Sequence, residues 1–402
     1  MKLYKKTILK YLQPMQKGYL FITLADGSTM ELGNKQNELH ADVTVLDDNF
    51  FKRAFLFGDI GFAEAFMAGE WTTTNLTALL SWFLLNVDNA PTLSGSTAKT
   101  IIVNGFQLAN KIFHSKRKNS LDGSKKNIAE HYDLSNEFFS LFLDKTMTYS
   151  SAYYSKPDLE LEKAQYEKYD SLCQSLKLNA NDHLLEIGTG WGGFAIYAAK
   201  TYGCKITSVT ISQQQYDFAT TRIKNENLSD QIDVQLKDYR LIEGKFDKVV
   251  SIEMIEAVGA QYLKVYFDKI QSVLKPNGVL ALQAIICPDS RFESFKKNVD
   301  FIQKHIFPGS LLPSIAAINT AINETGDLFM FGLKDMGKSY VITLSEWRKR
   351  FNENVEKVKL LGFDDAFIRK WNYYFSYCEA AFDMRNINVV QMVYTRPNNY
   401  KY

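Results

Sequence analysis

Residues 183–212, HLLEIGTGWGGFAIYAAKTYGCKITSVTIS, decide the fold of this chain of 402 residues. The run HLLEIG predicts a strand, and CKITSVT predicts a second strand. Between them, GGFAIYAAKTYG predicts a helix that ends at Gly203, because glycine commonly closes helices. Two strands joined by a crossover helix pair in parallel, so this stretch predicts the start of a parallel sheet.

The same alternation continues toward the C-terminus. We expect further strands in IDVQLK, FDKVVSI and GVLALQAII, and helices in SQQQYDFATTRIKNENL and EAVGAQYLKVYFDKIQSVL. This order predicts an α/β fold with a doubly wound parallel sheet. NVVQMVYT, residues 388–395, follows long helices rather than a short crossover, so we expect a last strand that is antiparallel. SIAAINTAINETG, residues 314–326, predicts a helical cap over the sheet.

Composition divides the chain into two folded regions. Residues 1–87 contain the hairpin pattern FITLADGSTMEL and aromatic-rich helical segments, which predict a small α+β accessory domain. Its aromatic residues form either an ordinary small core or a binding site for an apolar ligand. Residues 88–127 are typical of a linker with a short basic helix, and residues 128–402 carry the strand and helix alternation.

Charge and cysteine usage exclude several classes of function. The net charge of +2 argues against a nucleic-acid partner. Six Lys or Arg residues against one acid lie within residues 111–126, either as a solvated linker or as a segment attracted to anionic lipid headgroups. The four cysteines show no CxxC pair or histidine spacing, so we expect no metal site. No signal peptide is recognisable, and no apolar run approaches the ~18 residues of a membrane span, so we expect a cytoplasmic protein, peripheral at most.

A glycine-rich loop follows the first predicted strand of the sheet. Gly188, Gly190 and Gly192 lie where a strand meets a helix N-terminus, which lets the backbone approach a ligand closely. The spacing is not G-x-G-x-x-G, so a dinucleotide is disfavoured. The acidic Glu186 before the first glycine suits an ammonium group, which an adenosylmethionine ligand has and a pyrophosphate lacks.

The next two strand ends also carry polar residues. A nucleotide-binding sheet normally places an acid after its second strand, but VTISQQQ has none. Either no ribose binds here, or Gln215 and neighbouring hydroxyl groups replace the carboxylate. After the third strand, Tyr239 is suited to lie against an adenine ring and Asp238 to make a polar contact.

Two further motifs each fit two interpretations. TMTYSSAYY, residues 146–154, has seven hydroxyl side chains in nine positions, which fits a self-bonded turn or the wall of a polar binding site. SIEMIEAVG, residues 251–259, places Glu253 and Glu256 three residues apart at the end of the fourth strand. These paired acids suit either proton transfer or capping of the following helix.

Together, six ordered motifs resemble the cyclopropane-fatty-acyl-phospholipid synthases, a family of S-adenosylmethionine-dependent lipid methyltransferases that includes the mycolic acid cyclopropane synthases. The motifs are HYDLSNEFFSLFLDKTMTYSSAYY, LLEIGTGWGGFAIYAAKTYGCKITSVTIS, KDYR, SIEMIEAVG, HIFPGSLLPS and GKSYVITL. The resemblance covers about residues 125–397, and GDIGFAEAFMAGEW is similar to the accessory domain of bacterial synthases. It implies a Rossmann-like class I methyltransferase fold.

The resemblance also assigns the cofactor contacts. Tyr149 and Ser150 are expected to close over S-adenosylmethionine, and the glycine loop to cradle it. Thr210 and Gln215 are expected to serve the ribose, and Tyr239 the adenine. The family also has polar residues without a carboxylate after its second strand, which explains the missing acid.

The implied chemistry is methyl transfer to a cis double bond, which leaves a carbocation on the acyl chain. Loss of a methyl proton, to a bound bicarbonate ion in the family, then closes a cyclopropane ring. The resemblance assigns the bicarbonate contacts to five positions, namely Ser151, Glu256, Gln283, Ile285 and Tyr340.

This chain departs from the family pattern at that anion site. Ser151 stands where the family commonly has Cys, Gln283 where it has His, and Ala257 replaces another His. Serine and glutamine still hydrogen-bond an anion, so we expect the site to persist in altered form. We expect a cyclopropane product on an unsaturated phospholipid at the membrane surface, with methyl or methylene branching as the competing outcome. A non-catalytic lipid-binding protein and a methyltransferase for a soluble metabolite are also compatible with the sequence, and the resemblance suggests a homodimer.

Overall fold

The computed structural model describes residues 2–87, 134–400 and 402, which group into two compact units. Within the described residues, unit 1 comprises 2–87, 293–308 and 347–386, and unit 2 comprises 134–292, 309–346 and the C-terminal segment from 387. The expected linker over 88–127, with its basic segment, lies outside the described residues. Every helix in the described part of the chain is too short or too polar to cross a bilayer.

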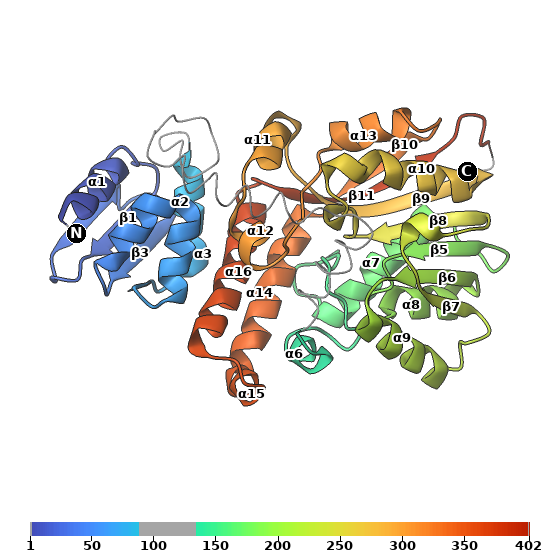
Figure 1. Ribbon diagram of the computed structural model, residues 1–402, viewed down its shortest axis with the longest axis horizontal. Helices are drawn as coiled ribbons and strands as arrows, with labels where there is room; N and C mark the ends of the chain where they lie inside the picture. The colour runs from blue at the N-terminus through green and yellow to red at the C-terminus, as the bar shows by residue number, and fades with distance from the viewer. Residues whose placement is uncertain (1, 88–133, 401) are drawn as a thin grey trace. The chain divides into compact units, whose positions relative to one another are not determined.

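Unit 2 is built on a seven-stranded sheet in the order β10-β11-β9-β8-β5-β6-β7 (Figure 1). The strands are β5 (His183–Ile187), β6 (Lys205–Thr210), β7 (Ile232–Leu236), β8 (Phe246–Ile252), β9 (Leu274–Ile286), β10 (Phe329–Asp335) and β11 (Asn388–Thr395). Strands β5 to β9 pair in parallel, and β11 pairs antiparallel with β9, as predicted. Strand β10, which among the described strands pairs with β11 alone, was not predicted.

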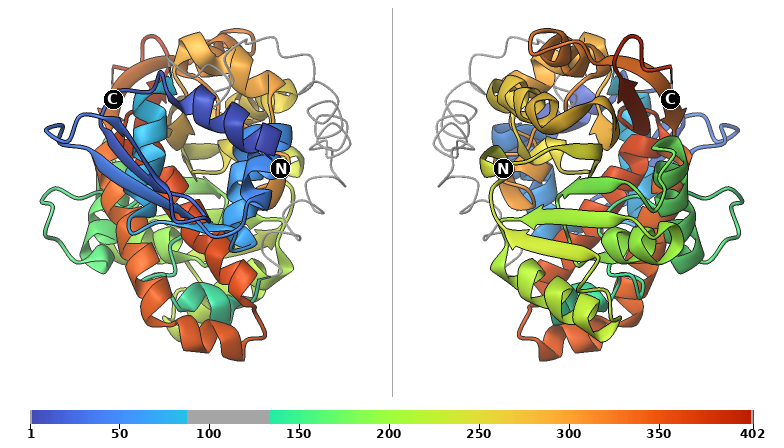
Figure 2. Two further views of the ribbon diagram at one scale, coloured as in Figure 1. Left: turned by 90° about the vertical axis from the view of Figure 1, so that its left-hand side faces the viewer. Right: turned by 90° about the vertical axis from the view of Figure 1, so that its right-hand side faces the viewer.

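Helices cover both faces of this sheet. The helices of unit 2 are α6 (Asn136–Ser140), α7 (Leu161–Ser175), α8 (Gly193–Tyr202), α9 (Gln213–Asn225), α10 (Leu263–Val273), α13 (Ile315–Asn323) and the first part of α14 (Gly337–Glu353). A hydrophobic core lies on each face of the sheet, because successive side chains of a strand point to opposite faces. In β5, Leu184 packs with residues of α7 and α8, whereas Leu185 packs with residues of α10 and of α13, the predicted cap helix. Figures 1 and 2 show α10 and α8 on opposite sides of the strands. The architecture is the predicted doubly wound α/β fold, in which ligands bind beyond the carboxyl ends of the parallel strands.

The predicted helix over residues 256–274 is wrong in its first part. Two 3-10 turns, Ile255–Ala257 and Ala260–Tyr262, precede α10. Gly259 separates them with φ 79°, a left-handed conformation that interrupts the helix. The segment after β8 is therefore a compact loop rather than the start of a helix.

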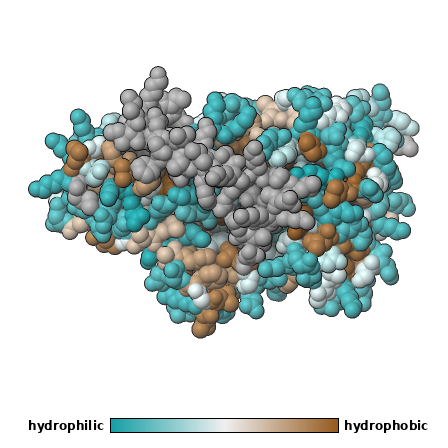
Figure 3. Space-filling model, in the orientation of Figure 1, coloured by the Kyte–Doolittle hydropathy of each residue, from teal (hydrophilic) through white to brown (hydrophobic). Residues whose placement is uncertain are grey.

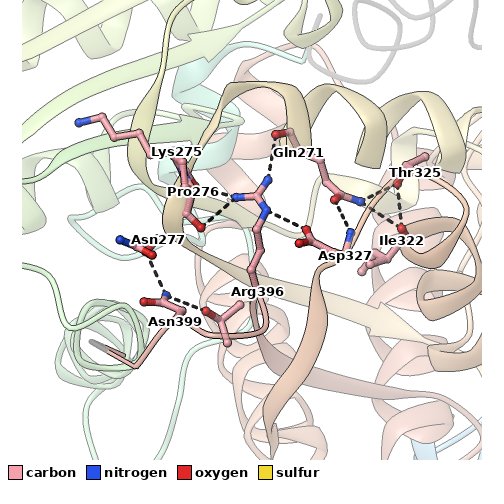
Figure 4. Close-up of polar contacts among 10 residues, drawn as sticks. Gln271, Lys275, Pro276, Asn277, Ile322, Thr325, Asp327, Arg396 and Asn399 are labelled. Carbon is pink, nitrogen blue, oxygen red and sulfur yellow. Dashed lines mark hydrogen bonds and ion pairs between the residues drawn. The ribbon is translucent and has the colours of Figure 1, made fainter.

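The antiparallel edge of the sheet is held by Arg396, which follows β11 (Figure 4). Its guanidinium donates to the Lys275 carbonyl at the start of β9 (2.6 Å), to the Gln271 carbonyl of α10 (3.2 Å) and to the Asp327 carboxylate before β10 (2.8 Å). Gln271 in turn donates to the Ile322 carbonyl of α13 (3.0 Å). One cation thus ties the last strands to the helices beside them.

Unit 1 contains a four-stranded sheet in the order β2-β1-β3-β4. Its strands are β1 (Tyr19–Thr23), β2 (Thr29–Gly33), β3 (His40–Val45) and β4 (Trp71–Thr72), and its helices are α1 (Lys2–Leu12), α2 (Asn49–Met67), α3 (Leu76–Leu85), α11 (Phe292–Lys297), α12 (Phe301–His305), α15 (Val355–Leu360) and α16 (Asp365–Asp383). The predicted hairpin is present, because β1 and β2 pair antiparallel around Gly27.

Unit 1 also recruits segments that lie far along the chain. Tyr373 of α16 packs its ring against Phe66 of α2 (5.9 Å between centroids) and Phe301 of α12 (4.7 Å). Arg369 donates to the Met67 carbonyl (2.8 Å). The sequence pattern placed these C-terminal segments in the catalytic domain, whereas the structure groups them with the N-terminal residues.

Candidate active site

The glycine loop follows β5 and leads into α8. Gly188, Gly190 and Gly192 all have positive φ, at 102°, 52° and 83°. A Cβ on Gly192 would also lie 3.3 Å from that of Ala219 on α9, so this position requires glycine for both conformation and space. The loop therefore presents backbone amides at the N-terminus of α8, where a ligand can approach closely.

Glu186, expected to meet an ammonium group, is buried at the end of β5. Ser208 of β6 donates to its Oε2 (2.5 Å), and the same hydroxyl lies 2.7 Å from Thr189 Oγ1 in the glycine loop. Burial raises the pKa of Glu186 to about 8. The carboxyl group thus supports the loop through Ser208.

The end of β6 brings together the two residues expected to serve a ribose. Thr210 Oγ1 donates to Gln215 Oε1 (2.9 Å), and both side chains are buried. Ser212 caps α9, and its hydroxyl accepts from the Gln215 amide (3.3 Å). The cap fixes Gln215 on the first turn of the helix, facing the end of the sheet.

After β7, Asp238 is engaged by its neighbour Arg240. The guanidinium donates to both carboxylate oxygens, at 2.8 Å from Nε and 2.6 Å from Nη2. Tyr239 is half-buried and meets Tyr266 edge to face, with centroids 5.3 Å apart. Burial raises the pKa of Tyr239 to about 12, so the phenol stays neutral.

The hydroxyl-rich segment 146–154 divides its side chains between two tasks. Ser151 Oγ donates to the Ala152 carbonyl (2.9 Å), as in a self-bonded turn, whereas Thr148 bonds the Tyr169 phenol of α7. The Ser150 carbonyl accepts from Gln165 (3.0 Å), and Ser150 Oγ accepts from Lys168 Nζ (2.8 Å). The segment is therefore fastened to α7 by buried polar contacts.

Tyr149 joins this segment to the glycine loop through aromatic packing. Its ring lies 5.3 Å from that of Phe139, which also meets the Trp191 ring at 5.1 Å. Trp191 Nε1 donates to Asn136 of α6 (2.7 Å), which fixes the indole. The two expected cofactor segments thus share one aromatic cluster.

Sequence reasoning missed Lys168, which is fully buried. Burial lowers its pKa to about 7. The sequence did contain a sign that this lysine is buried, because Lys168 lies at helical spacing from Leu161 and Leu172 on the buried face of α7. A lysine in that stripe was the detectable anomaly.

The carboxylate of Glu253 lies at the centre of the site. Its Oε1 accepts from the Ser151 backbone amide and from Gln283 Nε2, both at 2.8 Å. Its Oε2 accepts from the Tyr340 phenol at 2.9 Å. The backbone at Glu253 has φ 48°, an unusual conformation for a residue other than glycine. Three segments distant in the sequence therefore converge on this one carboxylate.

The second carboxyl of the pair, Glu256, has a different environment. Its Oε1 accepts from the Ile285 amide (2.5 Å), and its Oε2 has no hydrogen-bond partner among the described residues. Burial, reinforced by the charge of Glu253, raises the pKa of Glu256 to about 8. Glu256 is therefore neutral near pH 7.

Gln391 of β11 is a further residue that the sequence did not single out. It pairs in register with Gln283 of β9 and donates to Gln283 Oε1 (3.1 Å). This bond fixes the orientation of the Gln283 amide, so that its nitrogen points to Glu253.

The comparisons with known proteins agree with this geometry. Residues 119–392 match the family model described as mycolic acid cyclopropane synthetase. The chain belongs to this family. A tuberculostearic acid methyltransferase of Mycobacterium tuberculosis, UfaA1, is 37% identical over 358 residues, which cover 87% of this chain and 82% of that protein. The cyclopropane-fatty-acyl-phospholipid synthase of Escherichia coli K12 is 34% identical, over 89% of this chain and 88% of that one.

Among solved structures, the mycolic acid cyclopropane synthase CmaA1, complexed with SAH and CTAB, superposes with a TM-score of 0.63 at 27% identity, over 68% of this chain and 98% of that one. The chain is thus an S-adenosylmethionine-dependent methyltransferase of the lipid-modifying family. The residues present fit this cofactor, because the glycine loop offers close backbone approach and the Thr210 and Gln215 pair offers neutral polar groups at the adjacent strand end. Their individual contacts with it stay predictions.

Proposed function

We propose that this enzyme transfers a methyl group from S-adenosylmethionine to the cis double bond of an unsaturated phospholipid acyl chain and closes a cyclopropane ring. The observation that carries the proposal is the convergence of two sets of groups at the carboxyl ends of the parallel strands. The glycine loop and Thr210 suit the cofactor, and a buried carboxylate network around Glu253 suits proton removal. S-adenosylmethionine supplies an electrophilic methyl group.

The aromatic cluster of Tyr149, Phe139 and Trp191 supports an intermediate with positive charge on the acyl chain. Aromatic faces stabilise cations, and buried surroundings protect a carbocation from water.

A branched product, with a methyl or methylene group on the acyl chain, is the second candidate. It uses the same first step, and UfaA1 is named a tuberculostearic acid methyltransferase rather than a cyclopropane synthase. From the same cation, a methylene branch forms when a hydride shifts from the methylated carbon to the cationic carbon before a methyl proton is lost. A methyl branch with a retained double bond forms when the proton is lost from a neighbouring chain carbon. All of these products place the same demand on the cofactor site.

We also propose that the acyl chain is taken from a membrane surface. Helix α15 exposes Leu360 beside Lys357 and Lys359, Leu361 directly after the helix is also exposed, and apolar side chains gather on this part of the surface (Figure 3). Apolar residues flanked by lysines suit an anionic bilayer surface. The expected homodimer stays a prediction, which analytical ultracentrifugation checks.

The test is to incubate the purified protein with S-adenosylmethionine and liposomes of a monounsaturated phospholipid, and to analyse the fatty acids by mass spectrometry and NMR. Cyclopropane protons support ring closure, and a retained double bond with one added carbon supports branching. Cofactor binding without any added carbon would refute both products.

A further inference from the structure

Three polar groups donate hydrogen bonds to the carboxylate of Glu253. Because they come from distant parts of the chain, Glu253 does more than cap the turn that follows it. Ser151, Gln283 and Tyr340 reach it from three separate parts of the chain. Helix capping, which the sequence spacing also allowed, would instead use the amides of the following 3-10 turn Ile255–Ala257, and the contacts of Glu253 are made elsewhere. A strained, positive φ at Glu253 aims the side chain at this network.

We propose that the Glu253 carboxylate is the general base that takes the proton from the newly transferred methyl group. The proposal rests on the proposed function and names the base for its second step. The methyl carbon loses a proton to a Glu253 oxygen, and the electron pair of the broken C–H bond forms the carbon–carbon bond that closes the ring. This neutralises the acyl cation, and Glu253 becomes a carboxylic acid that releases the proton to solvent after turnover.

The bicarbonate ion implied by the family resemblance does not fit this arrangement. Of its expected contacts, the Ser151 amide, Gln283 and Tyr340 already bond Glu253, and the Ile285 amide bonds Glu256. An added anion would compete for these donors and would place another negative charge beside a buried carboxylate. The built-in side chain therefore takes the position expected for the diffusible ion.

Three hydrogen-bond donors distinguish Glu253 from Glu256 within the pair. Burial raises its pKa, but hydrogen bonds from three donors and the nearby Lys168 oppose that effect, whereas Glu256 lacks such donors at Oε2 among the described residues. A buried carboxylate whose two oxygens are positioned by hydrogen bonds is suited to accept a proton from a substrate bound beside it.

The test compares wild type, Glu253→Gln and Glu253→Gly in buffer freed of carbon dioxide, with and without added bicarbonate. We expect the wild type to form product at rates that bicarbonate changes by less than about twofold. Glu253→Gln preserves the shape but accepts no proton, so its product formation should fall by roughly 100-fold or more. Glu253→Gly relieves the backbone and opens the anion position, so bicarbonate should restore activity to this variant alone.

Controls separate chemistry from folding. Calorimetric binding of S-adenosylmethionine and circular dichroism should match the wild type in both variants. Product formation by Glu253→Gln at the wild-type rate, or a wild type that requires bicarbonate, would overturn the assignment of the base while leaving the proposed function intact. A wild type that binds cofactor and forms no product under either condition would instead refute the proposed function.

Discussion

Replacing the buried Lys168 by Met should make the protein more stable at neutral pH. The folded pKa is about 7 against an ordinary value of 10.5, so between these values the unfolded chain binds a proton that the folded chain lacks. At about pH 7.5 this difference costs the wild type about 4 kcal/mol. The lost hydrogen bond to Ser150 offsets about 1 kcal/mol, so the variant should be more stable by about 3 kcal/mol.

The sign of the pH dependence makes this prediction specific. Because the unfolded state binds more protons, Lys168 makes the unfolding free energy of the wild type rise with pH. The advantage of Lys168→Met should therefore shrink by roughly 2 to 3 kcal/mol between about pH 7.5 and 9.5. Urea unfolding of both proteins at the two pH values measures it, with Lys163→Met on the exposed side of the same helix as the control for lost charge. A stability difference that is equal at both pH values would refute the reasoning.

Two further perturbations address the cofactor loop and unit 1. Gly192→Ala forces φ 83° on a residue with a Cβ, which should cost about 1 to 2 kcal/mol of stability. It should also weaken the binding of S-adenosylmethionine, which calorimetry measures. The control Gly27→Ala, at φ 81° in unit 1, should lose stability without loss of affinity for the cofactor. Although burial opposes them, hydrogen bonds from His305 and Lys304 lower the pKa of Glu64 to about 2. Its stabilising contribution is therefore present above about pH 4.5 and lost as pH falls toward 2, so thermal melts of Glu64→Gln should show a weaker decline with acid; equal declines would contradict this.

The parallel part of the fold was predictable because its signals are local. Each strand and helix around the glycine loop has its own hydrophobic pattern and its own end signals, and the carboxyl ends of parallel strands must meet. Those facts suffice to bring Gly188, Thr210 and Tyr239 to one edge. Strand β10 was missed because its partner, β11, lies more than fifty residues further along the chain. The grouping of α16 with α2 depends on similarly distant contacts.

The polar core of the site was less predictable, for a different reason. The family resemblance assigned Ser151, Gln283 and Tyr340 to one set, and in the structure all three bond Glu253. It could not show that their common partner is Glu253, because hydrogen-bond partners depend on how separate elements pack. Lys168 was overlooked for the same reason, since a lysine is ordinarily exposed unless other elements bury it.

The positive φ at Glu253 also bears on how such an enzyme evolves. Glutamate and glycine codons differ by one base, and glycine suits this backbone better than glutamate does. If the side chain is the base, a single nucleotide change converts an enzyme that carries its own proton acceptor into one that borrows an acceptor from dissolved carbon dioxide. The dependence of a lipid modification on the gas supply of its host would then be set by one codon.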